Sequence, residues 1–303
     1  MNQKFYEELK NIIPEARIKA DEPMKMHTTF RIGGPAKYFV IPETKEEIKA
    51  IIECCKKADM PYYILGNGSN LLVSDKGYDG VVIQIFKNMN QITLDGNTIT
   101  AQAGAILSSV ANKALDASLT GFEFAAGIPG TLGGACVMNA GAYGGEMKDV
   151  LVNVVVLTKD GEFLTIPVEE LELGYRTSVI AKKDYIVLEA TIQLTKGDKE
   201  AIKARMDELK VQRTTKQPLE YPSAGSTFKR PVGYFAGKLI QDAGLRGFQV
   251  GGAQVSEKHC GFVINKDQAT AADVAELMRQ VSAIVKEQFG VELEAEVKRL
   301  GEF

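Results

Sequence analysis

The sequence contains little of what disulfide-rich and metal-binding proteins require. It has four cysteines and two histidines in 303 residues, and no C-x-x-C pair occurs. Cys54 and Cys55 are adjacent and the other two cysteines stand alone, so the spacing predicts neither a disulfide framework nor a zinc site. His27 and His259 are too few for a histidine-rich metal centre. We expect no metal, and structural or supporting roles for both histidines.

Unusual charge and long apolar runs are also lacking. Lys and Arg number 36 against 39 Asp and Glu, and the formal net charge of −3 does not indicate a nucleic-acid binder. No run approaches the roughly 18 apolar residues of a membrane helix. The first ten residues lack the apolar core of a signal peptide. We therefore expect a cytoplasmic protein without nucleic-acid or membrane partners, and no obligatory protein partner is evident.

What is present is an ordinary globular composition with mixed helix and strand signals. The length suits two or three domains. Helices are predicted from the capping box at Thr44, over Ile106–Ala117, over Lys199–Gln212 and from Thr270 to Gly290. Strands are predicted over Lys37–Ile41, Tyr62–Leu65, Val81–Phe86, Thr98–Ala103, Leu151–Leu157, Tyr185–Leu194, Gly261–Asn265 and Val291–Arg299.

The order of these elements predicts the fold class and the domain boundaries. Asp95-Gly96 and Asp160-Gly161 are typical of hairpin turns. Helices and strands do not alternate strictly, so an α+β fold is favoured over a doubly wound sheet. Boundaries near Gly80 and Gly197 predict three parts, residues 1–80, 81–200 and 201–303.

Glycine is concentrated in two segments. They are Leu65-Gly-Asn-Gly-Ser-Asn-Leu-Leu72 and Ala125-Ala-Gly-Ile-Pro-Gly-Thr-Leu-Gly-Gly-Ala135, which we call the first and second glycine loops. Glycine lets a backbone take positive φ and approach a ligand closely. Successive backbone N–H groups in such turns form concave anion sites. Two loops of this kind predict a dinucleotide held at its pyrophosphate from two sides.

The commonest phosphate-binding patterns do not fit these loops. The Rossmann fingerprint needs G-x-G-x-x-G, and Leu71 stands where the third glycine should be. A Walker loop needs Gly-Lys followed by Ser or Thr, and no such run occurs. The glycines alone leave a second interpretation open, in which both segments are tight turns of a β-rich protein.

Three further segments carry polar residues suited to chemistry. Arg176 lies in a short stretch of Gly, Thr and Ser before a strand, where it is either a surface residue or a fixed cation. Tyr221–Pro231 combines small and basic residues, as a phosphate- or carboxylate-binding loop needs, although composition alone favours a Pro/Gly turn that leads into a strand. Period-two alternation over Val291–Arg299 places its glutamates on one face.

In order along nearly the whole chain, these segments resemble the bacterial UDP-N-acetylenolpyruvoylglucosamine reductases, in the shorter form of the family. The matching motifs are Thr28-Thr-Phe-Arg-Ile-Gly-Gly34, Leu65–Leu72, Gly121–Gly145, Tyr175-Arg-Thr-Ser178, Arg213-Thr-Thr-Lys216, Ala224-Gly-Ser-Thr-Phe-Lys229 and Leu293-Glu-Ala-Glu-Val297. The stretch from Arg176 to Lys196 has no room for the tyrosine-bearing insertion of the longer form.

The resemblance implies an FAD-binding fold shared with vanillyl-alcohol-type oxidases. It would consist of two α+β lobes, residues 1–80 and 81–200, and a C-terminal substrate domain, residues 201–303. The first glycine loop has no histidine to tether flavin, so non-covalent FAD is expected. The residues implied to bind FAD are Gly66, Asn67, Gly68, Ser69, Asn70, Gly127, Ile128, Pro129, Gly130, Gly133, Gly134, Asn139 and Arg213.

The resemblance also implies a reaction and roles for individual residues. NADPH would reduce the flavin, which then delivers hydride to the enolpyruvyl double bond of a nucleotide sugar. Arg176 and a protonated Glu296 would stabilise the negative charge that develops. Glu296 would then need a raised pKa, which burial can provide. Ser226 would give the final proton. Residues implied to bind substrate are Tyr175, Lys216, Lys229 and Lys298.

Two alternatives predict different behaviour. An FAD-linked oxidase of the same fold would pass electrons to oxygen and would need neither Ser226 nor Glu296. A non-catalytic regulator that binds nucleotide sugars would keep the glycine loops without redox chemistry. A flavin spectrum excludes the regulator, and rapid anaerobic bleaching by NADPH disfavours the oxidase.

Overall fold

The computed structural model describes residues 3–303, which fold into two compact units. Unit 1 comprises the chain up to Lys19, Phe39–Asn67 and Val82–Arg213, and unit 2 comprises Ala20–Tyr38, Gly68–Val81 and Thr214–Phe303. The helices in the described range are α1 (Gln3–Lys10), α2 (Lys45–Lys57), α3 (Leu107–Asp116), α4 (Leu132–Val137), α5 (Val179–Lys182), α6 (Lys199–Lys216), α7 (Ala236–Asp242) and α8 (Ala271–Phe289).

The strands are mostly short. They are β1 (Ile18–Pro23), β2 (Pro35–Val40), β3 (Tyr62–Leu65), β4 (Leu71–Val73), β5 (Tyr78–Gln84), β6 (Ile92–Asp95), β7 (Thr98–Gln102), β8 (Leu119–Thr120), β9 (Gly141–Ala142), β10 (Gly145–Glu146), β11 (Leu151–Leu157), β12 (Phe163–Pro167), β13 (Ile186–Gln193), β14 (Thr195–Lys196), β15 (Ser223–Ser226), β16 (Gln249–Val250), β17 (Ala253–Val255), β18 (Phe262–Asn265) and β19 (Lys298–Leu300). Four of these strands form a sheet in the order β1-β2-β5-β3.

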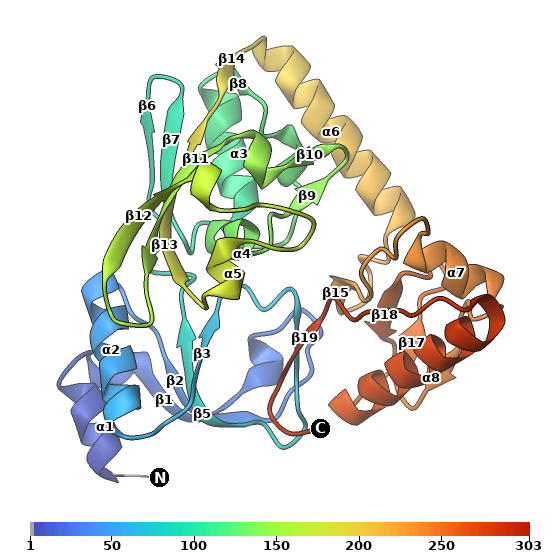
Figure 1. The fold of residues 1–303 in the computed structure, drawn as a ribbon, viewed down its shortest axis with the longest axis horizontal. Helices are drawn as coiled ribbons and strands as arrows, with labels where there is room; N and C mark the ends of the chain where they lie inside the picture. The colour runs from blue at the N-terminus through green and yellow to red at the C-terminus, as the bar shows by residue number, and fades with distance from the viewer. Residues whose placement is uncertain (1–2) are drawn as a thin grey trace. The chain divides into compact units, whose positions relative to one another are not determined.

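The centre of unit 1 is a five-stranded antiparallel sheet in the order β12-β11-β13-β7-β6. Both expected hairpins occur in it, because Asp95-Gly96 connects β6 to β7 and Asp160-Gly161 connects β11 to β12. Helix α4 packs on β7 and β13, and α3 packs on β7 (Figure 1). The sheet therefore supports the helix that begins in the second glycine loop.

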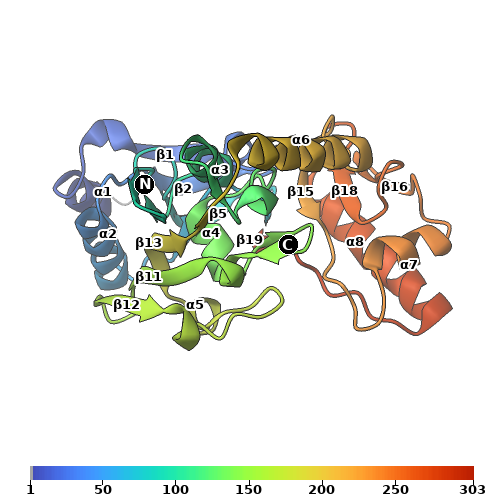
Figure 2. The ribbon, with the colours of Figure 1, turned by 90° about the horizontal axis from the view of Figure 1, so that it is seen from above.

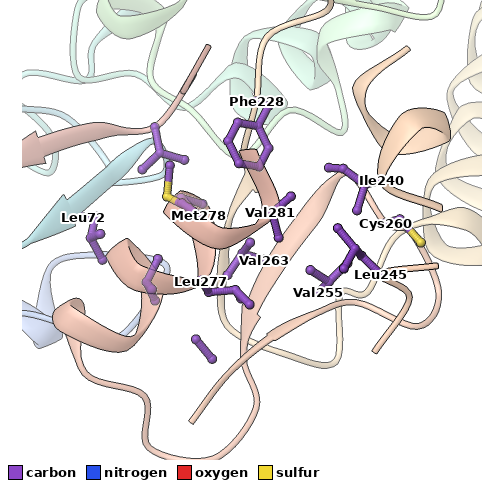
Figure 3. Close-up of a cluster of buried hydrophobic side chains, with 14 of the residues drawn as sticks. Leu72, Phe228, Ile240, Leu245, Val255, Cys260, Val263, Leu277, Met278 and Val281 are labelled. Atoms are coloured by element: carbon purple, nitrogen blue, oxygen red, sulfur yellow. The ribbon is translucent and has the colours of Figure 1, made fainter. Parts of the chain in front are cut away.

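Unit 2 is built on an antiparallel sheet in the order β15-β18-β17-β16. Helix α8 packs on β16, β17 and β18, and α7 packs on α8 (Figure 2). The buried apolar side chains between these elements form one cluster, which includes Phe228, Val263 and Val281 (Figure 3). Phe228 is the second residue after β15, so the cluster anchors the segment after Ser226.

Two sets of hydrogen bonds cap helix α8 at its N-terminus. The expected start at Thr270 is confirmed, since Thr270 and Asp273 form a capping box. In addition, both carboxylate oxygens of Asp75 accept hydrogen bonds from the backbone of α8, from Ala271 N at 2.7 Å and from Ala272 N at 3.0 Å. The segment after β4 is thereby fixed to the start of α8.

The expected strand over Val291–Arg299 is wrong in extent. Only Lys298–Leu300 forms a strand, β19, which pairs in parallel with β4. The expected alternation also fails, because Ala295 is exposed while Glu296 and Val297 are both buried. Before β19 the chain makes only an isolated bridge between Ala295 and Phe228. The other expected strands and all four helices occur within a few residues of their expected bounds, and the α+β class is confirmed.

Among residues 3–303, no helix combines the length and the apolarity that a membrane crossing would need. Nor do the described residues contain a cluster of His, Cys, Asp and Glu able to hold a metal ion.

We predict that Asp75→Ala lowers the free energy of unfolding by about 1 kcal/mol, because two N–H groups at the start of α8 lose their acceptor. Urea denaturation followed by circular dichroism measures this. Asp79→Ala is the matched control, because Asp79 is an exposed carboxylate whose only ion pair within residues 3–303 is with Lys37 at the surface. Equal losses in the two variants would contradict the capping role.

Candidate functional site

The first glycine loop connects β3 to β4, and the boundary between the units falls inside it. Gly66 and Asn67 belong to unit 1, whereas Gly68, Ser69 and Asn70 belong to unit 2.

In unit 1 the two glycine loops are in direct contact. Asn67 Nδ2 donates a hydrogen bond of 2.8 Å to the carbonyl oxygen of Pro129. A β-carbon on Gly66 would lie only 2.7 Å from Thr131 Oγ1, so a larger residue at 66 would push the loops apart. The sequence predicted two loops that act together, and the structure brings these parts of them together.

The second glycine loop ends in the short helix α4. Thr131 is its N-cap and accepts a hydrogen bond of 3.4 Å from Gly134 N. Gly133 N donates to the carbonyl oxygen of Ala103 at 2.8 Å, and a β-carbon on Gly133 would lie 2.8 Å from Ala103 Cβ. Gly133 is therefore required by packing on the end of β7.

Gly134 differs from its neighbour. It is exposed, and the nearest atom to an added β-carbon would be Thr131 Oγ1 at an ordinary 3.6 Å. Glycine inside a helix is less favourable than alanine by roughly 0.5–1 kcal/mol. The protein's own packing thus gives no reason for glycine at this position, whereas a ligand lying on α4 would.

A cationic side chain covers the start of the second glycine loop. The Cδ of Arg213 would lie 3.2 Å from a β-carbon on Gly127. Burial lowers the pKa of the Arg213 guanidinium, and the nearby phenol of Tyr143 opposes this. Within residues 3–303, the guanidinium of Arg213 forms no hydrogen bond or ion pair. A partly desolvated cation of this kind beside a glycine loop suits a phosphate group.

Arg176 stands in a tight turn. Gly174 and Thr177 exchange two backbone hydrogen bonds, of 3.1 and 3.3 Å. Arg176 has a φ of +55°, a left-handed conformation that favours glycine or asparagine. Its guanidinium carbon lies 5.2 Å from the ring centroid of Tyr175, which is 53% exposed. Unfavourable backbone at a polar residue is frequent at functional sites.

Asn139 does not extend its side chain toward open space. It is 1% exposed and has a φ of +44°. Its amide nitrogen donates to Glu146 Oε2 at 2.6 Å and to the carbonyl oxygen of Gly174 at 3.3 Å, and its amide oxygen accepts from Lys148 N at 2.9 Å. Both amide protons are thus bound by the chain itself.

In unit 2 the rest of the first glycine loop contacts the C-terminal segment. Asn70 Nδ2 donates to the carbonyl oxygen of Glu296 at 3.2 Å, and Asn70 O accepts from Lys298 N at 3.1 Å. Gly68 has a φ of +65°, and a β-carbon there would overlap the carbonyl oxygen of His27. Asn70 therefore fixes the backbone at Glu296 and at Lys298.

Ser226 and Glu296 lie on neighbouring segments of unit 2. Between them stands Thr227, whose carbonyl oxygen accepts a hydrogen bond of 2.9 Å from Glu296 N. The side chain of Ser226 is exposed, whereas Glu296 is 9% exposed. A register shift within β15, where Gly225 has a φ of +75°, precedes Ser226. The structure thus brings together two of the three expected catalytic residues in one unit.

The expected substrate-binding lysines have different surroundings. Lys229 forms an ion pair with Glu294, and its backbone N donates to Glu294 O at 2.8 Å. Lys216 ends α6 and Lys298 begins β19, and both are exposed. Within residues 3–303 neither ammonium group forms an ion pair. Lys216 and Lys298 are therefore more available to an anionic ligand than Lys229.

Two threonines with supporting roles were missed. Thr131 caps α4, and Thr227 Oγ1 accepts a hydrogen bond of 2.9 Å from Val263 N while its backbone links to Glu296. A threonine just before Leu-Gly-Gly is a recognisable N-cap signal, so Thr131 could have been found. Thr227 depends on pairing between distant segments, and nothing near it in the sequence indicates that.

The histidines and cysteines have the structural surroundings expected of them. His27 Nε2 lies 2.8 Å from Glu22 Oε1, and His259 Nδ1 accepts a hydrogen bond from Gly261 N at 3.1 Å. Burial lowers the pKa of His259 and raises the pKa of the Cys136 thiol to about 12.

A cavity of about 680 Å³ lies elsewhere in unit 2, bounded by α8, the end of the chain, Phe228 and Ala295. None of the expected site residues lines it.

Comparisons with known proteins cover the whole chain. The family described as "FAD binding domain" matches residues 36–167, and the family described as "UDP-N-acetylenolpyruvoylglucosamine reductase, C-terminal domain" matches residues 217–300. The UDP-N-acetylenolpyruvoylglucosamine reductase of Agathobacter rectalis is 57% identical, with 100% of each chain covered. That of Clostridioides difficile is 51% identical, with 99% of each chain covered.

A solved structure agrees with these relatives. The crystal structure of UDP-N-acetylenolpyruvylglucosamine reductase from Thermus caldophilus is 39% identical, with a TM-score of 0.80. The match covers 94% of this chain and 99% of that one.

We predict opposite effects of alanine at the two adjacent glycines of α4. Gly133→Ala destabilises the protein freed of any ligand, because the new methyl group meets Ala103. Gly134→Ala stabilises that protein by up to about 1 kcal/mol, because alanine favours the helix and fits the available space. Thermal unfolding of the two variants measures both shifts. A loss of stability in Gly134→Ala as large as in Gly133→Ala would contradict the packing described here.

Proposed function

Because the chain belongs to the family of UDP-N-acetylenolpyruvoylglucosamine reductases, we propose that it reduces the enolpyruvyl group of UDP-N-acetylglucosamine enolpyruvate to UDP-N-acetylmuramate, with NADPH as reductant. The reaction supplies a peptidoglycan precursor. The observation that carries the proposal is identity of 51% or more over essentially the full length of relatives with this activity in their names. The reaction belongs in the cytoplasm, where NADPH is regenerated, and needs no other protein.

The residues of unit 1 fit FAD. Asn67 holds the first glycine loop on Pro129 of the second, Arg213 offers a cation without an anionic partner among the described residues, and Gly134 leaves the outer side of α4 open. FAD, when bound, accepts hydride from NADPH and passes it to the carbon–carbon double bond of the substrate. Non-covalent binding is part of the proposal, since the first glycine loop offers no histidine for a tether.

We assign the two glycine loops to different parts of the cofactor. We assign the FAD phosphates to Gly66, Asn67 and the unit 2 residues Gly68, Ser69 and Asn70, with Arg213 as a cation. The residues assigned to the flavin end are Gly127, Ile128, Pro129, Gly130, Gly133 and Gly134. Residues 1–80 and 81–200 would act as cofactor lobes, and residues 201–303 as the substrate domain.

Arg176, Glu296 and Ser226 would handle the charge and the proton. Hydride addition leaves negative charge on the carbon next to the substrate carboxylate, and preorganised donors lower the energy of that state. Arg176 supplies a permanent cation from its tight turn. Glu296 is buried, which favours the neutral carboxyl that can donate a hydrogen bond. Ser226 gives the proton that completes the product. A hydroxyl suffices because the carbanionic acceptor is strongly basic.

The nucleotide sugar carries a carboxylate and a diphosphate, so it needs cations. Lys216 and Lys298 have free ammonium groups among the described residues, while Lys229 must leave Glu294 or share it. Tyr175, half exposed beside Arg176, offers a ring to the sugar or base. The proposal thus assigns substrate binding to Tyr175, Lys216, Lys229 and Lys298.

The function is tested by anaerobic turnover with product analysis. The purified protein is expected to show a flavin spectrum and to oxidise more than one NADPH per flavin only when the enolpyruvyl nucleotide sugar is present. Mass spectrometry should then find a product two hydrogens heavier than the substrate. A colourless protein, or NADPH oxidation that requires oxygen and ignores the nucleotide sugar, would reject the proposal.

We predict that Ser226→Ala separates the two halves of the reaction. Flavin reduction by NADPH stays near the wild-type rate, because Ser226 does not take part in it. Reoxidation by the nucleotide sugar slows by about 100-fold or more, the usual range for loss of a proton donor. Anaerobic stopped-flow absorbance measures each half separately. Ser223→Ala, on the same strand, is the control. If Ser226→Ala is reoxidised at the wild-type rate, another group is the donor.

Glu296→Ala is expected to slow reoxidation by a factor of about 100–1,000, because one donor to the developing charge is removed. Glu296→Gln loses less, since an amide also donates. Glu292→Ala is the matched control, an exposed glutamate four residues away that pairs only with Lys286. An unimpaired rate of reoxidation in Glu296→Ala would exclude Glu296 from charge stabilisation.

A further inference from the structure

Helix α4 connects two parts of the site within unit 1. Its first residue, Leu132, lies within the second glycine loop, and its last residue is Val137. Two residues further on stands Asn139, in the left-handed conformation. A helix of six residues is only about 9 Å long. A segment bonded to its C-terminal end is therefore fixed relative to the glycine loop at its N-terminal end.

The C-terminal end of α4 holds the Arg176 turn on both sides. Before the turn, Asn139 Nδ2 donates to the carbonyl oxygen of Gly174. After the turn, the buried Ser178 Oγ donates to the carbonyl oxygen of Val137 at 2.6 Å. The left-handed conformation of Arg176 is unfavourable for a free chain, and residues with such a backbone persist where their surroundings fix them.

The amide of Asn139 is suited to this task and to no other. Both its N–H groups are used by Glu146 and Gly174, and its oxygen accepts from Lys148 N. Asn139 is buried, so these bonds do not compete with water. A ligand could accept a hydrogen bond from its amide nitrogen only by breaking one of the two bonds to Glu146 and Gly174.

We propose that Asn139 is a positioning residue for Arg176 rather than a contact of the flavin. It fixes the carbonyl group of Gly174 and so sets the place of the Arg176 guanidinium relative to the cofactor loop on α4. The inference rests on the proposed function, since it concerns the reaction in which Arg176 takes part. Positioning acts on the substrate half-reaction and leaves cofactor binding and reduction by NADPH intact.

Exchanging the amide of Asn139 with the carboxylate of Glu146 distinguishes a positioning role of Asn139 from a structural one. Asn139→Asp keeps the shape and the acceptor for Lys148 N but loses both donors and faces the carboxylate of Glu146. Adding Glu146→Gln restores one carboxylate–amide pair, now with the amide on residue 146. The double variant therefore regains the bond to residue 146, while the Gly174 carbonyl still lacks a donor. Glu146→Gln alone is the control.

We expect the double variant to recover thermal stability and FAD content but to remain about 10- to 100-fold slower in reoxidation by the nucleotide sugar, the range for a misplaced reacting group. Reduction by NADPH should match the wild type. Recovery of the reoxidation rate together with stability would overturn the proposal, because Asn139 would then serve only the bond to residue 146.

A double-mutant cycle with Arg176→Ala gives the second readout, measured in single-turnover reoxidation. If Asn139 acts through Arg176, Asn139→Asp causes little further slowing once Arg176 is absent. The same fold loss in both backgrounds would overturn the proposal. The wild-type protein, measured in the same series, distinguishes failure of the proposed function from failure of the role assigned to Asn139. If the substrate fails to reoxidise wild-type flavin, the proposed function itself fails, whereas rate recovery by the exchange rejects only the role of Asn139.

Discussion

The contact between the two glycine loops is the constraint on which the rest of unit 1 depends. The bond from Asn67 to the carbonyl of Pro129 and the close approach of Gly66 to Thr131 leave no space for larger side chains between the loops. Thr131 also caps α4, so the same contact sets where that helix begins. The far end of α4 in turn holds the Arg176 turn. The second glycine loop, helix α4 and the Arg176 turn are thus connected to one another.

In unit 2, too, a few hydrogen bonds between distant segments hold the candidate site residues in place. Asn70 links the first glycine loop to Glu296 and Lys298, and Thr227 links Glu296 to the strand that carries Ser226. Asp75, just beyond β4, caps α8, whose apolar side packs on the sheet. Residues that the proposal assigns to the proton and to the developing charge therefore depend on backbone pairing between segments far apart in the sequence.

The sequence predicted the elements whose signals are local. The capping box at Thr270, the turn at Asp95-Gly96 and the strand Leu151–Leu157 each carry their own pattern of caps, turn residues or apolar spacing, and each occurs as expected. Within the site, the glycine content favoured two loops that hold one ligand but left tight turns open, and the structure shows that Asn67 of the first loop contacts Pro129 of the second. Whether these loops bind FAD stays a prediction for solution experiments.

The parts that could not be predicted depend on tertiary pairing. Alternation over Val291–Arg299 indicated a regular strand, but the chain there makes only one bridge to Phe228 before β19, so Glu296 turns inward and Ala295 outward. The left-handed conformation of Arg176 has no local signal, since arginine is not a residue that favours it. The use of the Asn139 amide by Gly174 likewise depends on a segment 35 positions away.

The most direct test of this account is anaerobic sequential-mixing absorbance of the wild-type protein at the flavin band. NADPH is added first, and the enolpyruvyl nucleotide sugar is added once the band has bleached. The account predicts that the substrate restores the oxidised flavin spectrum without oxygen, since the hydride passes to the substrate while Arg176, Glu296 and Ser226 are proposed to stabilise the resulting charge and to supply the proton. A band that stays bleached until oxygen is admitted would contradict it.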